Sequence, residues 1–323
     1  MYLFELVGED DAYATYEAST IADDVQLIAP GIAQATVAPP LVASLGFTRH
    51  VSEYLCQTDS TPSAAASSLR QCSLTRSGSA AVRAKALRGT KIDTQAVERH
   101  VGQVLVDRGF TIDLEEPEHE LRAIFSGETG YLGWEYSTPD PQFSTRQPTD
   151  RPFFQPGSMD PRLARSLINL AGGSPGKRLL DPMCGTGGIV LEAGLLGLDV
   201  LASDIQRTMI SGTHMNFKEF VPEGSIQLFT ASASMLPLSN NSCDAVVFDA
   251  PYGRQSPIRE ASQTTLIEAT LSEALRIAPR CVIVADRPLE TQIASTGWHC
   301  KAQFKRRVHR SLDRFIYDLH PRK

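Results

Sequence analysis

The C-terminal half of the chain alternates short apolar runs with longer amphipathic stretches. The apolar runs predict strands at residues 178–181, 199–203, 226–230, 245–249 and 281–285. The segments between them predict helices, among them 187–196, 206–217 and 264–277. A regular succession of strand, helix and strand is typical of a parallel sheet with helices on both faces. Residues 298–308 and 311–319 then predict two antiparallel strands joined by a short turn.

The N-terminal part shows a different pattern, typical of small α+β domains. Residues 1–60 mix alternating runs at 2–7, 25–29 and 47–56 with helical stretches. The segment 58–68 is rich in Ser, Thr and Ala and predicts a linker or exposed loop. A second unit follows, with predicted strands at 80–87, 111–114 and 121–125 and a predicted helix at 93–107 that an Asp or Thr would cap.

A proline-dense segment separates the two patterns. Residues 137–156 contain Pro139, Pro141, Pro148, Pro152 and Pro156, and prolines at this density exclude regular structure. The pair Asp160-Pro161 then predicts a helix start, with Asp as the N-cap and Pro at the first helical position. We therefore predict an α/β chain with domains over 1–68, 69–137 and 158–323 and a linker over 138–157.

Composition indicates an ordinary soluble protein. The chain of 323 residues is 42% apolar and 21% charged. Its apolar runs are far shorter than the ~18 residues of a membrane span, and early acidic residues such as Glu5 argue against a signal peptide. The six cysteines form no CxxC pair, which fits incidental thiols in a reducing compartment. We expect a cytoplasmic protein with no metal site.

The net charge of −6 at first argues against a nucleic-acid partner. The charges are unevenly distributed, however. No basic residue precedes Arg49, whereas residues 60–92 contain basic residues and no acidic one. The last 26 residues are again strongly basic, with eight Lys or Arg against two Asp. The overall charge is therefore an average over regions that differ in sign.

The strongest local motif is Asp181-Pro-Met-Cys-Gly185-Thr-Gly187-Gly188, which follows the first predicted parallel strand and opens a helix. Glycines let the backbone pass close to a ligand at such a turn. Asp204 ends the second predicted strand, where a carboxylate can accept hydrogen bonds from both ribose hydroxyls. The combination predicts a cofactor that contains a nucleoside.

The details of this motif favour S-adenosylmethionine over a dinucleotide. Val190 replaces the third glycine of the dinucleotide fingerprint, and Asp181 would repel a pyrophosphate. The same carboxylate would attract the cationic amino acid end of S-adenosylmethionine. A phosphate-binding P-loop is excluded because Ala171 stands where its first glycine belongs and Arg178 follows Lys177.

The fourth predicted strand ends in Asp249-Ala250-Pro251-Tyr252-Gly253, beside the expected cofactor. This segment resembles the D/N-P-P-Y tetrad of amino methyltransferases, with Ala250 in place of the first Pro. The Asp249 side chain and the carbonyl of Ala250 would accept hydrogen bonds from a nucleobase amine and direct its lone pair toward the methyl group. Pro251 keeps residue 250 extended, and Tyr252 would stack on the base.

Two further positions depart from simple expectations. In this fold the loop after the third strand usually carries an acid that binds the adenine amino group, and here Ser232 holds that position. Cys184 could be a nucleophile, as in enzymes that methylate pyrimidine carbon 5. No Pro-Cys pair follows the fourth strand, so incidental packing of the thiol is favoured.

The chain resembles the archaeal tRNA guanine-10 N2-methyltransferase family over most of its length. The similarity is carried by residues 151–165, 181–188, 203–205 and 249–256, and upstream by THUMP-like motifs at 82–85, 92–93, 98–102, 110–114, 117–122 and 132–133. The resemblance implies a ferredoxin-like N-terminal domain and a THUMP domain joined to a Rossmann-like methyltransferase domain. It also implies that the N-terminal module holds the acceptor end of tRNA, so that the base at position 10 reaches the site.

The same resemblance implies the site residues. Cofactor contacts are expected from Phe154, Pro156, Ser158, Met159, Asp181, Cys184, Gly185, Thr186, Gly187, Asp204, Ile205, Ser232 and Ala233, and the catalytic tetrad from Asp249, Ala250, Pro251 and Tyr252. We expect a monomer that methylates guanine N2 in tRNA, once or twice. The alternatives are another tRNA or rRNA guanine, a DNA adenine or a protein glutamine, and an RNA-binding protein whose methyltransferase domain is inactive.

Overall fold

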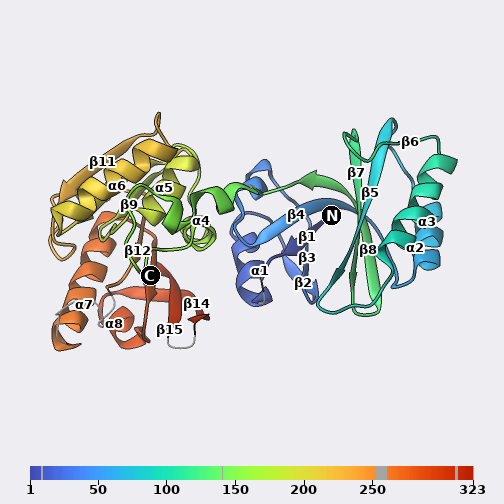
Figure 1. Cartoon of the computed structure of the whole chain (residues 1–323). Helices are drawn as coiled ribbons and strands as arrows, with labels where there is room; N and C mark the ends of the chain where they lie inside the picture. Colours follow the sequence, from blue (N-terminus) through green and yellow to red (C-terminus); the bar gives the residue numbers. More distant parts are fainter. Residues whose placement is uncertain (9, 140, 252–259, 310–311, 323) are drawn as a thin grey trace. The chain divides into compact units, whose positions relative to one another are not determined.

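The structure is a computed structural model that describes residues 1–8, 10–139, 141–251, 260–309 and 312–322. Its internal contacts divide the chain into two compact units, Met1–Asp140 and Pro141–Lys323, and Figure 1 shows a mixed α/β fold in each of them. None of the helices described is both long and apolar enough to cross a membrane.

The first unit is built on one eight-stranded sheet, in the order β2-β3-β1-β4-β8-β7-β5-β6. Its strands are β1 (Tyr2–Leu6), β2 (Gln26–Ala29), β3 (Ile32–Ala35), β4 (Thr48–Asp59), β5 (Ser79–Leu87), β6 (Thr111–Ile112), β7 (His119–Ser126) and β8 (Thr129–Ser137). Strand β5 pairs in parallel with β6 and β7, and the other pairs are antiparallel. Strands β4 and β8 join the two predicted N-terminal domains into a continuous sheet.

The described residues of this unit form three α-helices: α1 (Asp11–Ser19), α2 (Pro62–Gln71) and α3 (Thr94–Asp107). Helices α2 and α3 pack together beside strands β5, β7 and β8 (Figure 1). Leu69, Val101 and Leu105 from these helices meet Phe125 and Trp134 of the sheet in one apolar core. Burial of this core fixes the helices on the sheet.

Helix α2 replaces the loop predicted over residues 58–68. Thr61 is its N-cap, accepting a hydrogen bond from the Ala64 N–H (3.2 Å), and Pro62 occupies the first turn. The Ser- and Ala-rich composition obscured this cap-and-proline signal, which is the one that identified the helix start at Asp160. The predicted boundary at residue 68 therefore falls inside a helix.

The second unit contains a seven-stranded sheet in the order β11-β10-β9-β12-β13-β15-β14. The strands are β9 (Arg178–Asp181), β10 (Asp199–Asp204), β11 (Ile226–Thr230), β12 (Ala245–Asp249), β13 (Cys281–Ala285), β14 (Trp298–His309) and β15 (Leu312–Pro321). Strands β9 to β13 are parallel and agree closely with the predicted positions. The chain order reverses between β9 and β12, and ligands bind at such a switch point.

Helices cover both faces of this sheet, as predicted (Figure 1). They are α4 (Pro161–Leu170), α5 (Gly188–Leu195), α6 (Arg207–Phe220), α7 (Glu260–Ile277) and α8 (Glu290–Ser295). Leu271 of α7 packs with Phe248, Ile283 and Trp298 in an apolar core on one face. Asp160 caps α4 by accepting hydrogen bonds from the N–H groups of residues 162 and 163, which confirms the predicted start.

The segment predicted as a linker is folded against the second unit. It contains two 3-10 turns, η2 (Pro141–Arg146) and η3 (Pro148–Asp150). The buried Arg146 guanidinium donates from Nε to Glu192 Oε1 (2.6 Å), and Arg165 of α4 also pairs with Glu192 (2.8 Å). Because these buried charges satisfy one another, the proline-rich segment is anchored to α4 and α5.

The last two strands form the predicted antiparallel pair, and β15 is inserted between β13 and β14. Arg314 on β15 comes one residue before Phe315, which pairs with Ala285 at the carboxyl end of β13. The hairpin thus brings residues from the end of the chain to the edge of the sheet where the parallel strands end.

Candidate active site

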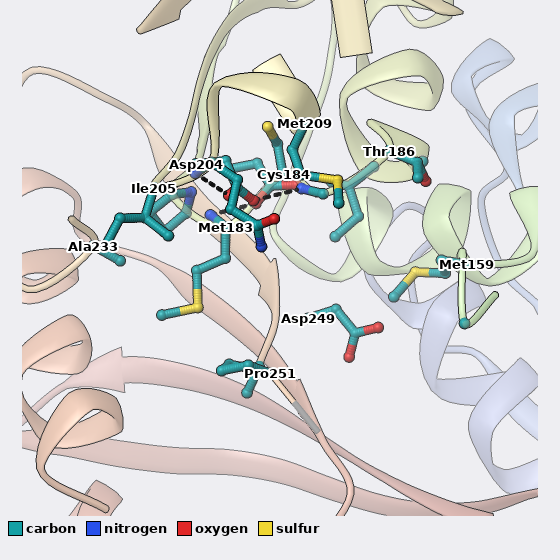
Figure 2. A pocket seen from close by; sticks show the side chains of 18 of the residues that line it. Met159, Met183, Cys184, Thr186, Asp204, Ile205, Met209, Ala233, Asp249 and Pro251 are labelled. Atoms are coloured by element: carbon teal, nitrogen blue, oxygen red, sulfur yellow. Dashed lines mark hydrogen bonds between the residues drawn. The ribbon is translucent and has the colours of Figure 1, made fainter. Parts of the chain in front are cut away.

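One cavity of about 540 Å³ lies at the carboxyl ends of the central parallel strands. This volume is within the ~300–1,000 Å³ range of small-molecule sites. Asp181, Asp204 and Asp249, which end β9, β10 and β12, all line it. Figure 2 shows Asp204 beside the glycine turn at Cys184, and Asp249 nearer Pro251. The topological switch therefore brings three carboxylates from separate strands into one pocket.

The glycine turn after β9 is held by a threonine behind it. Gly185 and Gly187 both have positive φ, +51° and +81°, and Gly187 caps α5. The Thr213 hydroxyl of α6 donates to the Gly185 carbonyl (2.9 Å). A Cβ on Gly187 would lie only 2.8 Å from Thr213 Cγ2, so a side chain is excluded there. The glycines thus let the turn sit tightly against α6.

Asp204 is fixed by two backbone groups. The Gly185 N–H donates to Oδ2 (3.1 Å) and the Gln206 N–H donates to Oδ1 (2.9 Å). A carboxylate has about four lone-pair positions, so each oxygen keeps acceptor capacity for a ligand. This arrangement suits the recognition of paired hydroxyl groups such as those of a ribose.

Asp181 is only 2% exposed, and its described hydrogen bond comes from the Met183 N–H (3.1 Å). Burial raises the pKa of this carboxyl well above its ordinary value, and the nearby Asp204 and Asp249 raise it further. No Lys or Arg occurs among the described residues that line the cavity. A pocket with three acids and no base favours a cationic ligand and disfavours phosphates.

The segment before α4 closes the pocket from another side. Gln155, Pro156, Gly157, Ser158 and Met159 line the cavity, and the Ser158 hydroxyl lies 2.8 Å from the Thr186 hydroxyl. Asn216 of α6 donates to the carbonyls of both Phe153 and Thr186 (2.8 Å each). These bonds tie the segment to the glycine turn.

The end of β12 supplies the groups that would face a substrate. The Asp249 side chain is 19% exposed, and its Oδ2 lies 3.6 Å from the Arg314 guanidinium. The Ala250 N–H donates to the Val284 carbonyl (2.8 Å), and Gln263 donates to the Pro251 carbonyl (3.1 Å). Neighbouring elements therefore fix the backbone on both sides of Ala250. Tyr252 lies outside the described residues.

Most of the expected site residues are brought together by the fold. The cavity lining includes Pro156, Ser158, Met159, Asp181, Cys184, Gly185, Thr186, Asp204, Ile205, Ser232, Ala233, Asp249, Ala250 and Pro251. Phe154 and Gly187 are not part of it. The Phe154 side chain is 44% exposed, and the Cα of Gly187 faces Thr213. The expected cofactor contacts of these two residues stay predictions.

Several lining residues were not anticipated, among them Met183, Gln206, Met209 and Leu266. Met183 lies inside the Asp181–Gly188 motif and could have been found from its position there. Met209 and Leu266 belong to helices α6 and α7, and only the packing of these helices brings them to the pocket. Figure 2 shows the thioethers of Met183 and Met209 at the cavity.

The thiol of Cys184 is unsuited to nucleophilic attack. Burial raises its pKa well above the ordinary value, with a further contribution from Asp181, so the reactive thiolate is disfavoured. Its sulfur lies 3.6 Å from the Thr213 hydroxyl, which packs behind the turn. This supports a packing role for the side chain.

Fold and site together define an S-adenosylmethionine-dependent methyltransferase. A family model described as "RMKL-like, methyltransferase domain" matches residues 148–315. A tRNA (guanine(10)-N2)-dimethyltransferase from Methanothermobacter thermautotrophicus is 35% identical over 242 residues, covering 73% of this chain and 71% of that protein. The chain belongs to the archaeal tRNA guanine-10 N2-methyltransferase family.

Two further relatives extend the comparison. A tRNA (guanine(6)-N2)-methyltransferase from Thermus thermophilus is 39% identical over 101 residues, or 30% of this chain and 28% of that protein. The crystal structure of TrmN from Thermus thermophilus superposes with a TM-score of 0.54 at 20% identity, covering 99% of both chains. The second similarity establishes that the fold is shared over both units.

Proposed function

We propose that this protein transfers a methyl group from S-adenosylmethionine to the exocyclic N2 of guanine 10 in tRNA. The observation that carries the proposal is the placement of Asp249, at the end of β12, in the same acidic cavity as Asp181 and Asp204. The named activity of the Methanothermobacter relative supports guanine 10 as the target. One or two methyl groups would be added to the same nitrogen.

The residues present fit S-adenosylmethionine, which supplies an electrophilic methyl group on a sulfonium when bound. Asp181 would attract the cationic amino acid end, and the absence of basic side chains from the described lining leaves the positive sulfonium unopposed. Asp204 would accept hydrogen bonds from the ribose hydroxyls. Ile205, Ser232 and Ala233 would lie against the adenine, and Pro156 and Ser158 would cover the cofactor.

The chemistry required of the protein is to direct the guanine amine. Its lone pair is delocalised into the ring, so the amine is a weak nucleophile. The Asp249 carboxylate and the Ala250 carbonyl would accept hydrogen bonds from the two N–H groups of this amine and so direct its lone pair at the methyl carbon. Formation of the C–N bond would be balanced by loss of the methyl–sulfur bond, whose electron pair would stay on sulfur as a neutral thioether, and a proton would leave the nitrogen toward Asp249 or water. The base would have to leave the stack to reach this cavity.

We assign the binding of the tRNA acceptor end to the first unit, which carries the THUMP-like motifs at residues 82–133. Its strand β5 and helix α2 contain Arg70, Arg83 and Lys85 from the acid-free span 60–92. Phosphate contacts from such residues would position the RNA without reading its sequence. We also propose that the protein is a monomer in the cytoplasm.

The proposal is tested by methyl transfer to a tRNA transcript, with the modified nucleotide mapped by mass spectrometry. Asp249→Ala should lower kcat by about 10²- to 10³-fold, because it removes a hydrogen-bond acceptor for the reacting amine. Asp244→Asn is the matched control, since Asp244 precedes the same strand but pairs with Lys177 at the opposite end (2.9 Å). Undiminished transfer by Asp249→Ala would refute the proposed role of this residue.

A second target, guanine 6, is favoured by the Thermus relative of that name. Transcripts in which G6 or G10 is replaced by adenine separate the two. Loss of incorporation only with the G10 replacement supports our proposal, and loss only with the G6 replacement supports the alternative.

A further inference from the structure

Asp249 has a buried cationic neighbour that does not line the cavity. One Nη atom of Arg314 lies 3.6 Å from Asp249 Oδ2, and the Arg314 side chain is only 5% exposed. Arg314 comes from β15, far from Asp249 in sequence, and was absent from the residues expected at the site. A guanidinium remains charged in proteins even when it is buried.

The register of the sheet explains how the two residues meet. Asp249 pairs with Val284 on β13, and Val284 pairs with Ile316 on β15. Arg314 therefore lies at the same carboxyl edge, two residues beyond Ile316 and two strands from Asp249. Arg314 is not among the described residues that line the cavity, although its partner Asp249 is.

The other charged residues described in the cavity lining are acidic and disfavour a negative charge on Asp249. Asp181 and Asp204 line the same cavity, and the charge of Asp249 adds to the cost of ionising Asp181. A cation behind Asp249 offsets this repulsion without adding a positive group to the cavity surface. The negative charge of Asp249 thus has a cationic partner within the protein.

We propose that Arg314 is a positioning residue for methyl transfer, which pairs with Asp249 through Oδ2 and so fixes the orientation in which this carboxylate meets the substrate amine. This inference rests on the proposed role of Asp249. It assigns the C-terminal hairpin a part in the chemistry, in addition to its place in the sheet.

The test compares Arg314→Met and Arg314→Gln with Arg314→Lys in steady-state assays on the RNA that the wild-type protein methylates. We expect both uncharged variants to lower kcat by roughly 10- to 100-fold, with KM for RNA and Kd for S-adenosylmethionine changed by less than about threefold. Arg314→Lys should recover part of kcat because it restores the charge without the second guanidinium nitrogen. Lys305→Met, on the same hairpin but exposed, should resemble wild type.

A double-mutant cycle with Asp249→Asn then identifies the residue through which Arg314 acts. Arg314→Met should cost little further activity once Asp249 is neutral, because the charge that it serves is gone. Equal losses in both backgrounds would overturn the inference, as would an increase in KM for RNA at constant kcat, which indicates an RNA contact. Failure of Arg314→Lys to exceed Arg314→Gln, with both proteins folded by circular dichroism, would also overturn it.

The two proposals fail in different ways. If wild-type protein modifies another guanine, the target in the proposed function is wrong, but the same variants still test Arg314 on that RNA. If Asp249→Ala is fully active, the proposed role of Asp249 and with it that of Arg314 are overturned, whereas the proposed target is judged separately by the mapped nucleotide. If Asp249→Ala is inactive and Arg314→Met is not impaired, only the role of Arg314 is overturned.

Discussion

Asp181 illustrates how a residue with a proposed binding role can oppose stability. Its carboxyl is almost fully buried, has no basic residue beside it in the described cavity lining, and lies near two other acids. The folded-state pKa is raised above the unfolded value, so the folded protein binds the proton more tightly. The resulting loss of stability is absent below the unfolded pKa and develops as pH rises through the folded pKa. A cationic ligand would reverse this penalty.

This predicts that the affinity for S-adenosylmethionine increases with pH over the range in which Asp181 of the free protein ionises. The sign follows because the deprotonated carboxylate attracts the cationic cofactor and the neutral acid does not. Calorimetric titration between about pH 5 and 8 measures the dependence. Asp181→Asn should bind more weakly and with a flatter pH profile, whereas Asp244→Asn should retain the wild-type slope. Affinity that decreases with pH would contradict the prediction.

At the scale of elements, the glycine turn links the parallel sheet to the cofactor pocket. Its geometry depends on Gly187, which combines a left-handed φ of +81° with a close approach to Thr213 on α6. The turn is therefore specified by packing against a helix as well as by backbone freedom. A substitution here affects stability and the cofactor site together.

Gly187→Ala should lower the free energy of unfolding of the second unit by about 1–3 kcal/mol, through backbone strain and contact with Thr213. It should also weaken binding of S-adenosylmethionine. Urea unfolding followed by circular dichroism, together with calorimetry, checks both effects. Gly102→Ala is the control, because a Cβ there meets nothing within 4 Å in the interior of α3. That change should be neutral or stabilising by up to ~1 kcal/mol.

The elements predicted from sequence were those whose signals are local. Strands β9 to β13 are continuous apolar runs, and helix α4 has an explicit cap and proline. Strand β8 was missed because Gly130 and Gly133 weaken its strand signal. A Cβ at Gly133 would lie 2.6 Å from the Glu53 carbonyl oxygen of β4, so glycine is required by a contact that the sequence does not reveal.

The site residues that could be predicted are likewise those with a local signal in the sequence. Asp181, Asp204 and Asp249 each end a strand, and the rule that strand ends share one edge of a parallel sheet was enough to group them. Met209, Leu266 and Arg314 reach the site only through the packing of α6, α7 and β15. Their apolar or basic character is common, so nothing in the local sequence distinguishes them from ordinary core or surface residues.

At the scale of the whole molecule, the described residues that line the cavity all belong to the second unit, whereas the first unit has its own sheet and core. The charge pattern does not follow this division, because the first unit holds both the acid-free span 60–92 and the acid-rich stretches 1–48 and 113–140, whereas the basic segment 298–323 lies in the second unit. Our proposal that the first unit binds the tRNA acceptor end therefore rests on the THUMP-like motifs and on a local basic span.

We predict that residues 141–323 expressed alone fold and bind S-adenosylmethionine about as tightly as the full chain. Their kcat/KM on tRNA should be lower by roughly 100-fold or more, because phosphate contacts from the first unit would be lost. Calorimetry and methyl-transfer assays with the full chain as control measure the two quantities. Equal kcat/KM for fragment and full chain would show that the first unit is not needed to position tRNA.

Strand β15 has a consequence for how the protein is made. It is the last strand in sequence, yet it occupies an interior place between β13 and β14. During synthesis the edge of β13 stays open until residues 312–321 leave the ribosome, and an open apolar edge can pair with other chains. A nascent or prematurely terminated second unit is therefore a candidate for chaperone capture, and the sheet that carries the site is completed only after this strand has been synthesised.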